Sequence, residues 1–196
     1  MPEPIRVDLP VARERLAELS AGDEVRLFGP VYTCRDAGHE LLLAQLADEG
    51  TLPFGLDGAT LFYAGPTPAA AGRPVGAVGP TTAKRMDAAT PALLRAGVVA
   101  AIGKGGRSEA VRKAFAETGS VYFGAVGGAA AMLATRVVAA EPIAWPELGT
   151  EALVRMTLED FPAFVSIDAR GNDLYSDAPG VWRAARDAAD PGGGAE

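Results

Sequence analysis

The chain has 196 residues, a formal net charge of −7 at pH 7 and 48% hydrophobic residues, which favours one globular domain and argues against global disorder. The negative charge disfavours nucleic acid as a partner, because binding to a phosphate backbone needs a basic surface. A single cysteine, Cys34, excludes an internal disulfide and any zinc or iron–sulfur cluster held by thiolates of this chain alone.

The sequence predicts neither export nor membrane insertion. Residues 1–4 show neither the basic nor the apolar region of a secretory signal peptide. The closest approach to a spanning segment, residues 121–134, contains three glycines and is shorter than the roughly 20 residues that a bilayer requires. We therefore expect a cytoplasmic protein with no membrane contact.

The first candidate site residue follows an alternating apolar pattern. Residues 24–28 and 31–33 predict two strand segments. Asp36 then stands where it can cap a helix over residues 37–49. Arg35 is therefore expected at a strand-to-helix corner, where α/β folds place ligand contacts.

Residues 79–87, Gly-Pro-Thr-Thr-Ala-Lys-Arg-Met-Asp, predict a loop that turns into a helix, with Thr81 or Thr82 as its N-cap. Lys84 and Arg85 would lie in the first turn, where the helix dipole disfavours each cation by roughly 0.3–1 kcal/mol. A helix with only a structural role would favour acids at these positions. The stretch is therefore typical of a site for a negatively charged guest.

The rest of the chain alternates strand and helix patterns, which indicates an α/β fold. Residues 97–102 form a continuous apolar run, as expected for a strand buried on both faces. Lys104 follows on a glycine-rich loop before a helix that Ser108 can cap, which predicts a second place for an anion. The other predicted strands cover residues 59–63, 75–78, 120–123, 137–139 and 163–167.

The C-terminal part is predicted to close with a hairpin and a tail. Residues 168–173 read as a turn that pairs the preceding strand with Leu174-Tyr175. The sequence then becomes polar and rich in alanine and glycine. We expect a domain over residues 1–178 and a tail over 179–196 that frays.

Several alternative sites are disfavoured by spacing. The loop at 103–106 lacks both the early glycine and the following Ser or Thr of a phosphate-binding loop, because Val99 and Gly105 stand at those positions. His39 is the only histidine, so neither a catalytic triad nor a metal site with several imidazoles can form. His39 can support the site or simply hold the helix start, and Cys34 is read as inert packing.

Arg35, Arg85 and Lys104 share one context, the junction between a strand, a loop and a helix. Taken singly, each is more simply a solvated surface charge. Together with Thr81 they suit a small dicarboxylate, because arginine offers a planar fork to a carboxylate and lysine a point charge.

Several strings in order resemble the β-subunit, or C-terminal domain, of class I iron–sulfur fumarate hydratases and their L-tartrate dehydratase relatives. The resemblance covers roughly residues 5–175 and rests on several motifs together. They are Tyr-Thr-Cys-Arg-Asp-Ala-Gly-His at 32–39, Phe-Tyr-Ala-Gly-Pro at 62–66, the stretch 79–87, Gly-Lys-Gly-Gly at 103–106, and residues 147–149, 160–163 and 168–172.

The resemblance implies a fold and a site. The fold is a swivelling β/β/α domain, a mixed sheet with flanking helices. Arg35, Arg85 and Lys104 would hold the substrate carboxylates. Thr81 would lie next to the carbon that gains or loses a proton, and Gly105 would let the backbone approach the ligand. The candidates for supporting contacts are Asp36, His39 and Thr82.

The resemblance also implies a function that this chain does not perform alone. It would be the β-subunit of a hydro-lyase that interconverts fumarate and (S)-malate. The four-iron four-sulfur cluster would belong to an α-subunit, no metal would bind this chain, and β-subunits would form homodimeric contacts in the assembled enzyme. The alternatives are the β-subunit of an L-tartrate dehydratase and a non-catalytic carboxylate-binding module.

Two departures from the family pattern leave roles open. Glu40-Leu41 stands where many relatives carry basic residues, and Lys84 stands where the family residue is often small or polar. The turn at residues 63–68 looks closer to the fumarases than to the tartrate dehydratases.

Overall fold

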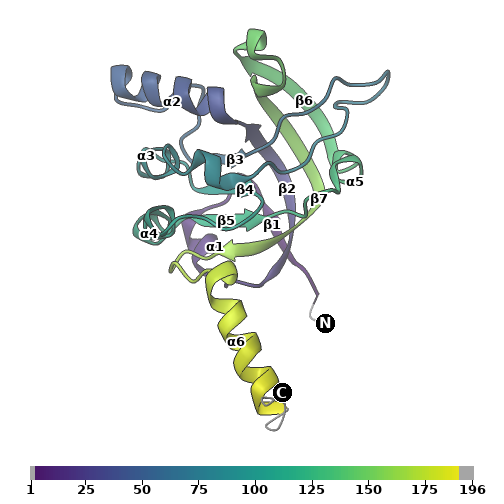
Figure 1. Cartoon of the computed structure of the whole chain (residues 1–196). Helices are drawn as coiled ribbons and strands as arrows, with labels where there is room; N and C mark the ends of the chain where they lie inside the picture. The colour runs from purple at the N-terminus through teal and green to yellow at the C-terminus, as the bar shows by residue number, and fades with distance from the viewer. Residues whose placement is uncertain (1–2, 190–196) are drawn as a thin grey trace.

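The computed structural model describes residues 3–189, and within them seven strands form one mixed sheet (Figure 1). The strand order is β1-β2-β3-β4-β5-β7-β6, with a further pairing between β2 and β7. The strands are β1 (Ile5–Asp8), β2 (Glu24–Thr33), β3 (Thr60–Phe62), β4 (Ala100–Gly103), β5 (Val121–Gly124), β6 (Val137–Ala144) and β7 (Leu153–Ile167). The helices are α1 (Arg13–Ala17), α2 (Asp36–Glu49), α3 (Thr90–Arg95), α4 (Glu109–Thr118), α5 (Ala130–Ala134) and α6 (Leu174–Ala189), with 3₁₀ helices over Ala83–Met86 and Pro146–Glu151.

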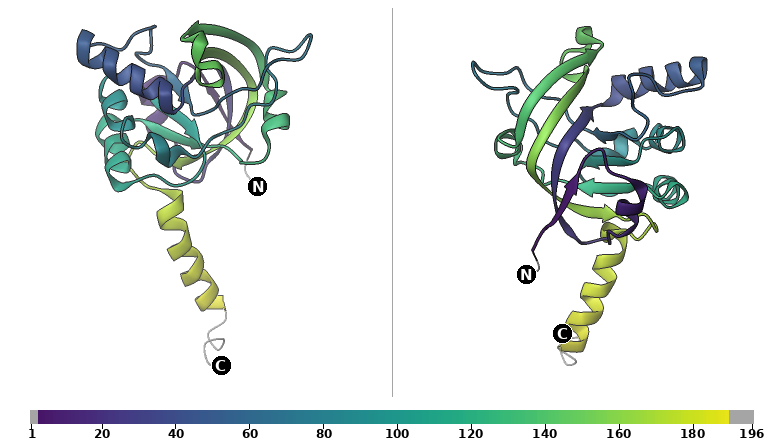
Figure 2. Two further views of the ribbon diagram at one scale, coloured as in Figure 1. Left: turned by 45° about the horizontal axis from the view of Figure 1, so that its top comes forward. Right: turned by 180° about the vertical axis from the view of Figure 1, so that it is seen from behind.

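Part of the sheet closes on itself. β2, β3, β4 and β5 run parallel to one another, and β7 pairs antiparallel with both β5 and β2. β7 can reach both partners because it is 15 residues long and shifts register along its length. Helices α2, α3 and α4 stack along one side of the sheet (Figures 1 and 2). The mixed sheet with flanking helices agrees with the predicted fold class.

The central strands separate two apolar cores. Phe62 and Ile102 belong to the core inside the curved sheet, whereas their neighbours Leu61 and Ala101 belong to the core under the helices. Because successive side chains of a strand point to opposite faces, each of these strands must be apolar throughout. The strand predicted from the apolar run at 97–102 is confirmed as β4, which is buried on both faces but covers only Ala100–Gly103.

The carboxyl ends of β2, β3 and β4 meet at one edge of the sheet, since these strands are parallel neighbours. The loop after β3 returns there, where Pro80 forms an isolated bridge with Ala64 and Thr82 forms one with Lys104. Gly103 permits this approach, because a Cβ at that position would lie 3.0 Å from the Cβ of Ala83. The topology thus brings three loops together at this edge.

The helix predicted at residues 79–87 is wrong in detail. Only Ala83–Met86 is helical, as a 3₁₀ turn without a side-chain cap, and α3 begins separately at Thr90. The backbone groups that a longer helix would use are taken by the neighbouring loops: Thr81 N–H donates to Tyr63 O and Ala83 N–H to Lys104 O. Residues 75–78, predicted as a strand, are irregular: Gly76 N–H donates to Thr67 O within the same loop, and Val78 N–H donates to Ala130 O.

The predicted C-terminal hairpin is also wrong. A single bridge joins Ile167 to Asp173, and α6 starts at the next residue. Asp173 causes the change, because its carboxylate accepts hydrogen bonds from Tyr175 N–H (3.0 Å) and from the Ser176 hydroxyl (2.8 Å), as a helix cap does.

Helix α6 projects away from the sheet (Figure 2). It includes residues 179–189 of the tail that was expected to fray, and residues 190–196 lie outside the described part. The domain boundary at residue 178 stays a prediction. None of the helices in residues 3–189 has the length and apolar character needed to cross a bilayer.

Candidate carboxylate-binding site

Arg35 leaves the end of β2 and immediately precedes α2. Its side chain is 23% exposed, and its Nη2 lies 3.5 Å from Glu151 Oε1 and 4.0 Å from Asp36 Oδ2. Gly65 makes room for it, because a Cβ there would lie 2.6 Å from Arg35 Nη1. Arg35 is thus held at the edge of the sheet with part of its guanidinium facing solvent.

Arg85 reaches the same edge from the 3₁₀ turn. Its Nη2 lies 3.2 Å from Asp36 Oδ2 and donates a 2.6 Å hydrogen bond to Thr81 Oγ1. Asp36 Oδ2 therefore lies within 4.0 Å of both the Arg35 and the Arg85 guanidinium groups. The structure brings Arg35, Asp36, Arg85 and Thr81 into one cluster of polar side chains.

Lys104 joins this cluster through the backbone. Its N–H donates to Thr81 O (3.2 Å), and its carbonyl accepts from Ala83 N–H (3.0 Å). Its side chain runs past Gly127, where a Cβ would lie 3.6 Å from Lys104 Nζ. Gly105 follows with φ of 85°, which glycine adopts without steric cost.

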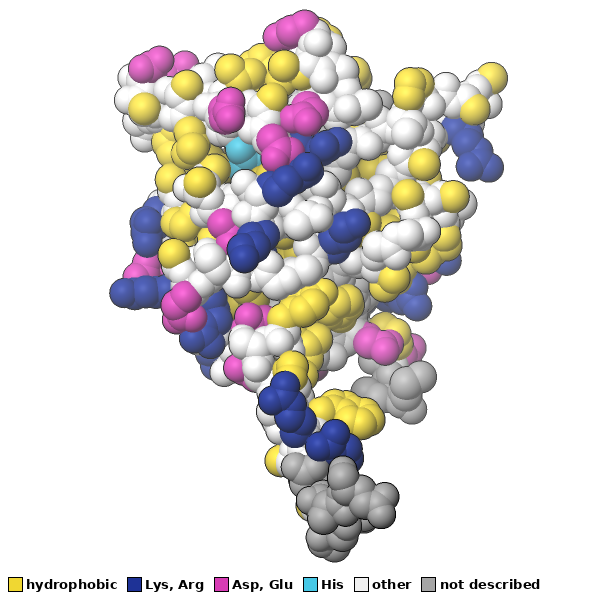
Figure 3. All heavy atoms as spheres, viewed as in Figure 1, with side chains coloured by type: hydrophobic (Ala, Val, Ile, Leu, Met, Phe, Trp, Pro, Cys, Tyr) yellow, Lys and Arg dark blue, Asp and Glu magenta, His cyan; other side chains and the backbone are white. Residues whose placement is uncertain are grey.

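A hollow of about 450 Å³ opens beside Lys104. Figure 3 shows basic and acidic side chains gathered on this face, over β3 and β4. Its lining combines polar side chains, such as Lys104, with apolar ones, such as Val126 and Phe164. It is lined by Thr82, Lys104, Gly105, Ala125, Val126, Gly127, Phe164 and Tyr175.

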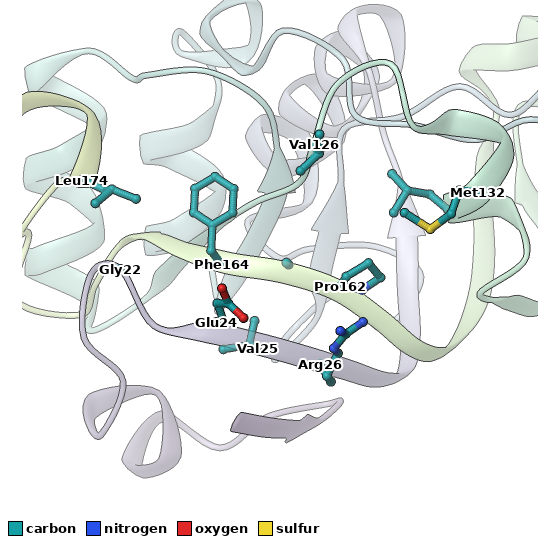
Figure 4. Close-up of a pocket in the computed structure, with 11 residues that line it drawn as sticks. Gly22, Glu24, Val25, Arg26, Val126, Met132, Pro162, Phe164 and Leu174 are labelled. Carbon is teal, nitrogen blue, oxygen red and sulfur yellow. The ribbon is translucent and has the colours of Figure 1, made fainter. Parts of the chain in front are cut away.

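A second hollow, of about 470 Å³, is also lined by Val126 and Phe164 (Figure 4). Its walls are mainly apolar, and its charged residues are Glu24 and Arg26. Since opposite charges there offset each other and none of the three predicted cations lines it, this hollow suits an anion less well than the one at Lys104.

The predicted supporting residues occupy different places. Asp36 lies between the two arginines, and Thr82 bridges Lys104 by its backbone while its side chain is exposed. His39 lies behind Arg35: it is 2% exposed, and its Nδ1 is 2.8 Å from the Arg35 carbonyl oxygen. A carbonyl accepts only from a protonated nitrogen, so Nδ1 carries the proton. Of the three, His39 therefore holds the start of α2.

Burial lowers the pKa of His39 to about 4. The folded chain then stays neutral at this residue while the unfolded chain takes up a proton below its ordinary pKa of 6.5. Stability from the neutral imidazole is complete above that value and is lost as the pH falls towards 4. We expect unfolding free energy to drop by about 1 kcal/mol between roughly pH 7 and pH 5.5.

Urea unfolding at the two pH values measures this slope. Because His39 is the only histidine, His39→Gln should remove most of the slope between these pH values. A slope that persists undiminished in a folded His39→Gln variant would contradict the assignment.

The described residues offer no set of ligands for a metal. They contain no group of three or more His, Cys, Asp or Glu side chains that could hold an ion. Cys34 is buried, and burial raises the pKa of its thiol. Since the thiolate is the reactive form of cysteine, this agrees with the prediction that Cys34 only packs. An iron–sulfur cluster does not fit the side chains present here.

Sequence reasoning missed Glu151, Arg107 and Asp87. Glu151 contacts Arg35 from a distant part of the chain, and its other oxygen accepts a 2.9 Å hydrogen bond from Ala37 N–H. No local pattern could reveal that contact. Arg107 and Asp87 were visible at the ends of the two glycine-containing strings, but their mutual 2.7 Å ion pair depends on how the loops fold together.

The chain is similar in sequence to known proteins. The family model described as "Fumarase C-terminus" matches residues 2–178. The anaerobic class I fumarate hydratase of Escherichia coli (strain K12) is 40% identical over 181 residues, covering 88% of this chain and 33% of that protein. Fumarate hydratase 2 of Leishmania major is 36% identical, covering 88% of this chain and 31% of that protein.

A third relative is matched over most of its own length: the putative L(+)-tartrate dehydratase subunit beta of Methanocaldococcus jannaschii. It is 32% identical over 173 residues, which cover 85% of this chain and 89% of that protein. The chain thus spans about a third of the fumarate hydratases it matches and most of the tartrate dehydratase subunit. With the matching family model and these identities, the chain belongs to the fumarase C-terminus family.

Proposed function

We propose that this chain is the β-subunit of a two-subunit hydro-lyase and supplies the substrate-binding half of a site for the reversible hydration of fumarate to (S)-malate. The observation that carries the proposal is the convergence of two guanidinium groups on one carboxylate oxygen, that of Asp36, beside a hydroxyl. A substrate carboxylate can bind to the guanidinium N–H groups of Arg35 and Arg85 that do not contact Asp36.

The cations have two tasks in this mechanism. Arg35 and Arg85 bind one carboxylate of the substrate, and Lys104 binds the other. Loss or gain of a proton next to a carboxylate passes through a carbanion-like state whose charge spreads into that carboxylate. Fixed cations stabilise this charge without having to reorganise during the reaction.

Thr81 is the proposed group at the proton-transfer step. An isolated threonine is a poor base, but Arg85 Nη2 donates to its Oγ1 over 2.6 Å. This contact stabilises negative charge on the hydroxyl oxygen, as hydrogen bonding to a charged form generally does. Further activation would come from a neighbouring group of the partner chain.

The remaining chemistry is assigned to a partner. In our proposal an α-subunit would hold a four-iron four-sulfur cluster, which would supply Lewis-acid chemistry at the substrate hydroxyl group. Contacts between two β-type chains belong to the same proposal. The name "subunit beta" of the Methanocaldococcus jannaschii relative supports a division into separate chains.

Turnover assays with and without a reconstituted cluster-bearing chain test this function. Fumarate hydration is expected only from the mixture, with each chain alone inactive. Full turnover by the purified single chain would refute the division of labour. As a control, the cluster-bearing chain is assayed with a β-type chain whose Arg85 is replaced by methionine.

The same assay separates the nearest alternative. A tartrate dehydratase subunit would turn over L-tartrate faster than (S)-malate. The higher identity to a fumarate hydratase, 40% against 32%, favours fumarate. A non-catalytic module would bind malate in calorimetry with this chain alone, and no partner would confer turnover.

A further inference from the structure

Arg107 is a buried cation directly beneath the candidate site. Its side chain is 0% exposed, and its guanidinium carbon lies 5.3 Å from the centre of the Tyr63 ring and 5.1 Å from that of Tyr122. Taking a charge out of water is costly even when it is paired and lies over aromatic faces. A site that needed only packing would be filled by an apolar side chain.

The side chain of Arg107, which follows the loop of Lys104, contacts the segment that carries Thr81 and Arg85 and the start of α3. Its Nε donates to Asp87 Oδ1 and its Nη2 to Thr90 Oγ1, both over 2.7 Å. The second oxygen of Asp87 accepts from Ser108 N–H, also over 2.7 Å. Each member of the Asp87–Arg107 pair therefore makes two hydrogen bonds to the opposite side of the gap between the loops.

The two loops carry the proposed substrate contacts at their other ends. Asp87 closes the segment that holds Thr81 and Arg85, and Arg107 closes the loop that holds Lys104 and Gly105. Near the mouth, the loops are joined by the two backbone hydrogen bonds between residues 81–83 and Lys104. The buried ion pair between Asp87 and Arg107 is a second connection, at the ends of the two segments away from the proposed substrate contacts.

Among residues 3–189, the segment 81–90 and the loop 103–108 are joined directly by the two backbone hydrogen bonds and by three hydrogen bonds of Asp87 and Arg107. The 3₁₀ turn Ala83–Met86 has no side-chain cap, and Gly105 and Gly106 lower the stiffness of the second loop. Tyr122 adds one contact, because its hydroxyl donates to the Gly105 carbonyl oxygen over 3.2 Å while its ring faces Arg107. The buried pair thus supplies the side-chain hydrogen bonds that join the two loops directly.

We propose that Arg107 and Asp87 are positioning residues, which set the placement of Thr81 and Arg85 relative to Lys104. This inference rests on the proposed function for its catalytic consequence, but the coupling of the loops is a property of the chain itself. Displacement of a catalytic group by about 1 Å can cost about 10²-fold in rate. A small shift between the loops is therefore enough to impair turnover.

The test is the double variant Arg107→Met/Asp87→Asn, which removes both charges and leaves an oxygen for Ser108 N–H. Replacing both members of a buried pair avoids an uncompensated charge. We expect the thermal unfolding midpoint to stay within about 5 °C of the wild type. Native-state hydrogen exchange at the amides of Ala83 and Lys104 should accelerate at least about tenfold.

The catalytic readout uses the enzyme reconstituted with its cluster-bearing chain. We expect kcat/KM for fumarate hydration to fall about 10²-fold in the double variant, mostly through kcat. Arg95→Met/Glu117→Gln is the matched control, because it removes an exposed pair of 2.9 Å between α3 and α4. The control should change neither exchange at Ala83 and Lys104 nor kcat/KM.

A folded double variant with unchanged exchange and unchanged kcat/KM would overturn the proposal. If the double variant does not fold, Arg107→Lys replaces it, which keeps the charge but not the two-sided reach to Asp87 and Thr90. The same two effects are then expected at about tenfold in kcat/KM, and their absence overturns the proposal. If exchange accelerates but the wild-type mixture does not hydrate fumarate, the coupling stands and the proposed function fails.

Discussion

Arg85→Met is expected to lower kcat/KM for fumarate hydration by about 10²–10³-fold in the assembled enzyme, equivalent to roughly 2.7–4 kcal/mol of transition-state stabilisation. The substitution removes one of the two guanidinium groups at Asp36 and the donor to Thr81. The loss should appear in both KM and kcat, since Arg85 binds the substrate carboxylate and supports the hydroxyl. Steady-state kinetics with fumarate measure it.

Lys84→Met provides the matched control. Lys84 lies on the same 3₁₀ turn and is exposed, and its replacement by methionine removes the same charge from the chain as Arg85→Met does. A general loss of positive potential would affect both variants equally, whereas loss of a specific contact affects only Arg85→Met. Arg85 is 45% exposed, so little change in the unfolding midpoint is expected. Equal activities of the two variants would contradict the assignment of Arg85.

Thr81→Val is expected to reduce kcat for fumarate hydration by about 10²–10⁴-fold with a small effect on KM. Valine keeps the shape of threonine and removes the hydroxyl that accepts from Arg85. Since the cations that bind the carboxylates remain, substrate affinity should change little. The kcat against KM split in steady-state kinetics is the measurement.

Two comparisons sharpen this prediction. Thr81→Ser keeps the hydroxyl and should retain most of the activity. Thr82→Val removes the neighbouring hydroxyl, which makes no contact to Arg85 or Asp36 among the hydrogen bonds of residues 3–189, and should lower kcat far less than Thr81→Val. A Thr81→Val enzyme with wild-type kcat would exclude the hydroxyl from proton transfer.

The grouping of the site residues was predictable because it follows from topology. Arg35 and Lys104 each follow the end of a predicted strand within two residues, and parallel strands end at one edge of a sheet. The doubly buried character of residues 97–102 was readable from their continuous apolar run. Membership of the fumarase family, predicted from the ordered strings, is confirmed by the matching model.

The local structure around these residues was less predictable, because long-range contacts override local preference. The segment 79–87 has a helical sequence pattern, yet its backbone groups bond to β3 and to the Lys104 loop. Glu151 reaches Arg35 from a separate 3₁₀ helix. The hairpin at the C-terminus fails because Asp173 caps a helix, although its flanking residues read as a turn.

The most direct measurement is a structure of the assembled enzyme with (S)-malate bound. We expect one carboxylate of malate within hydrogen-bond distance of Arg35 and Arg85, the other within reach of Lys104 Nζ, and Thr81 Oγ1 next to the carbon that exchanges its proton. Malate bound at a site that contacts none of Arg35, Arg85 and Lys104 would contradict this expectation.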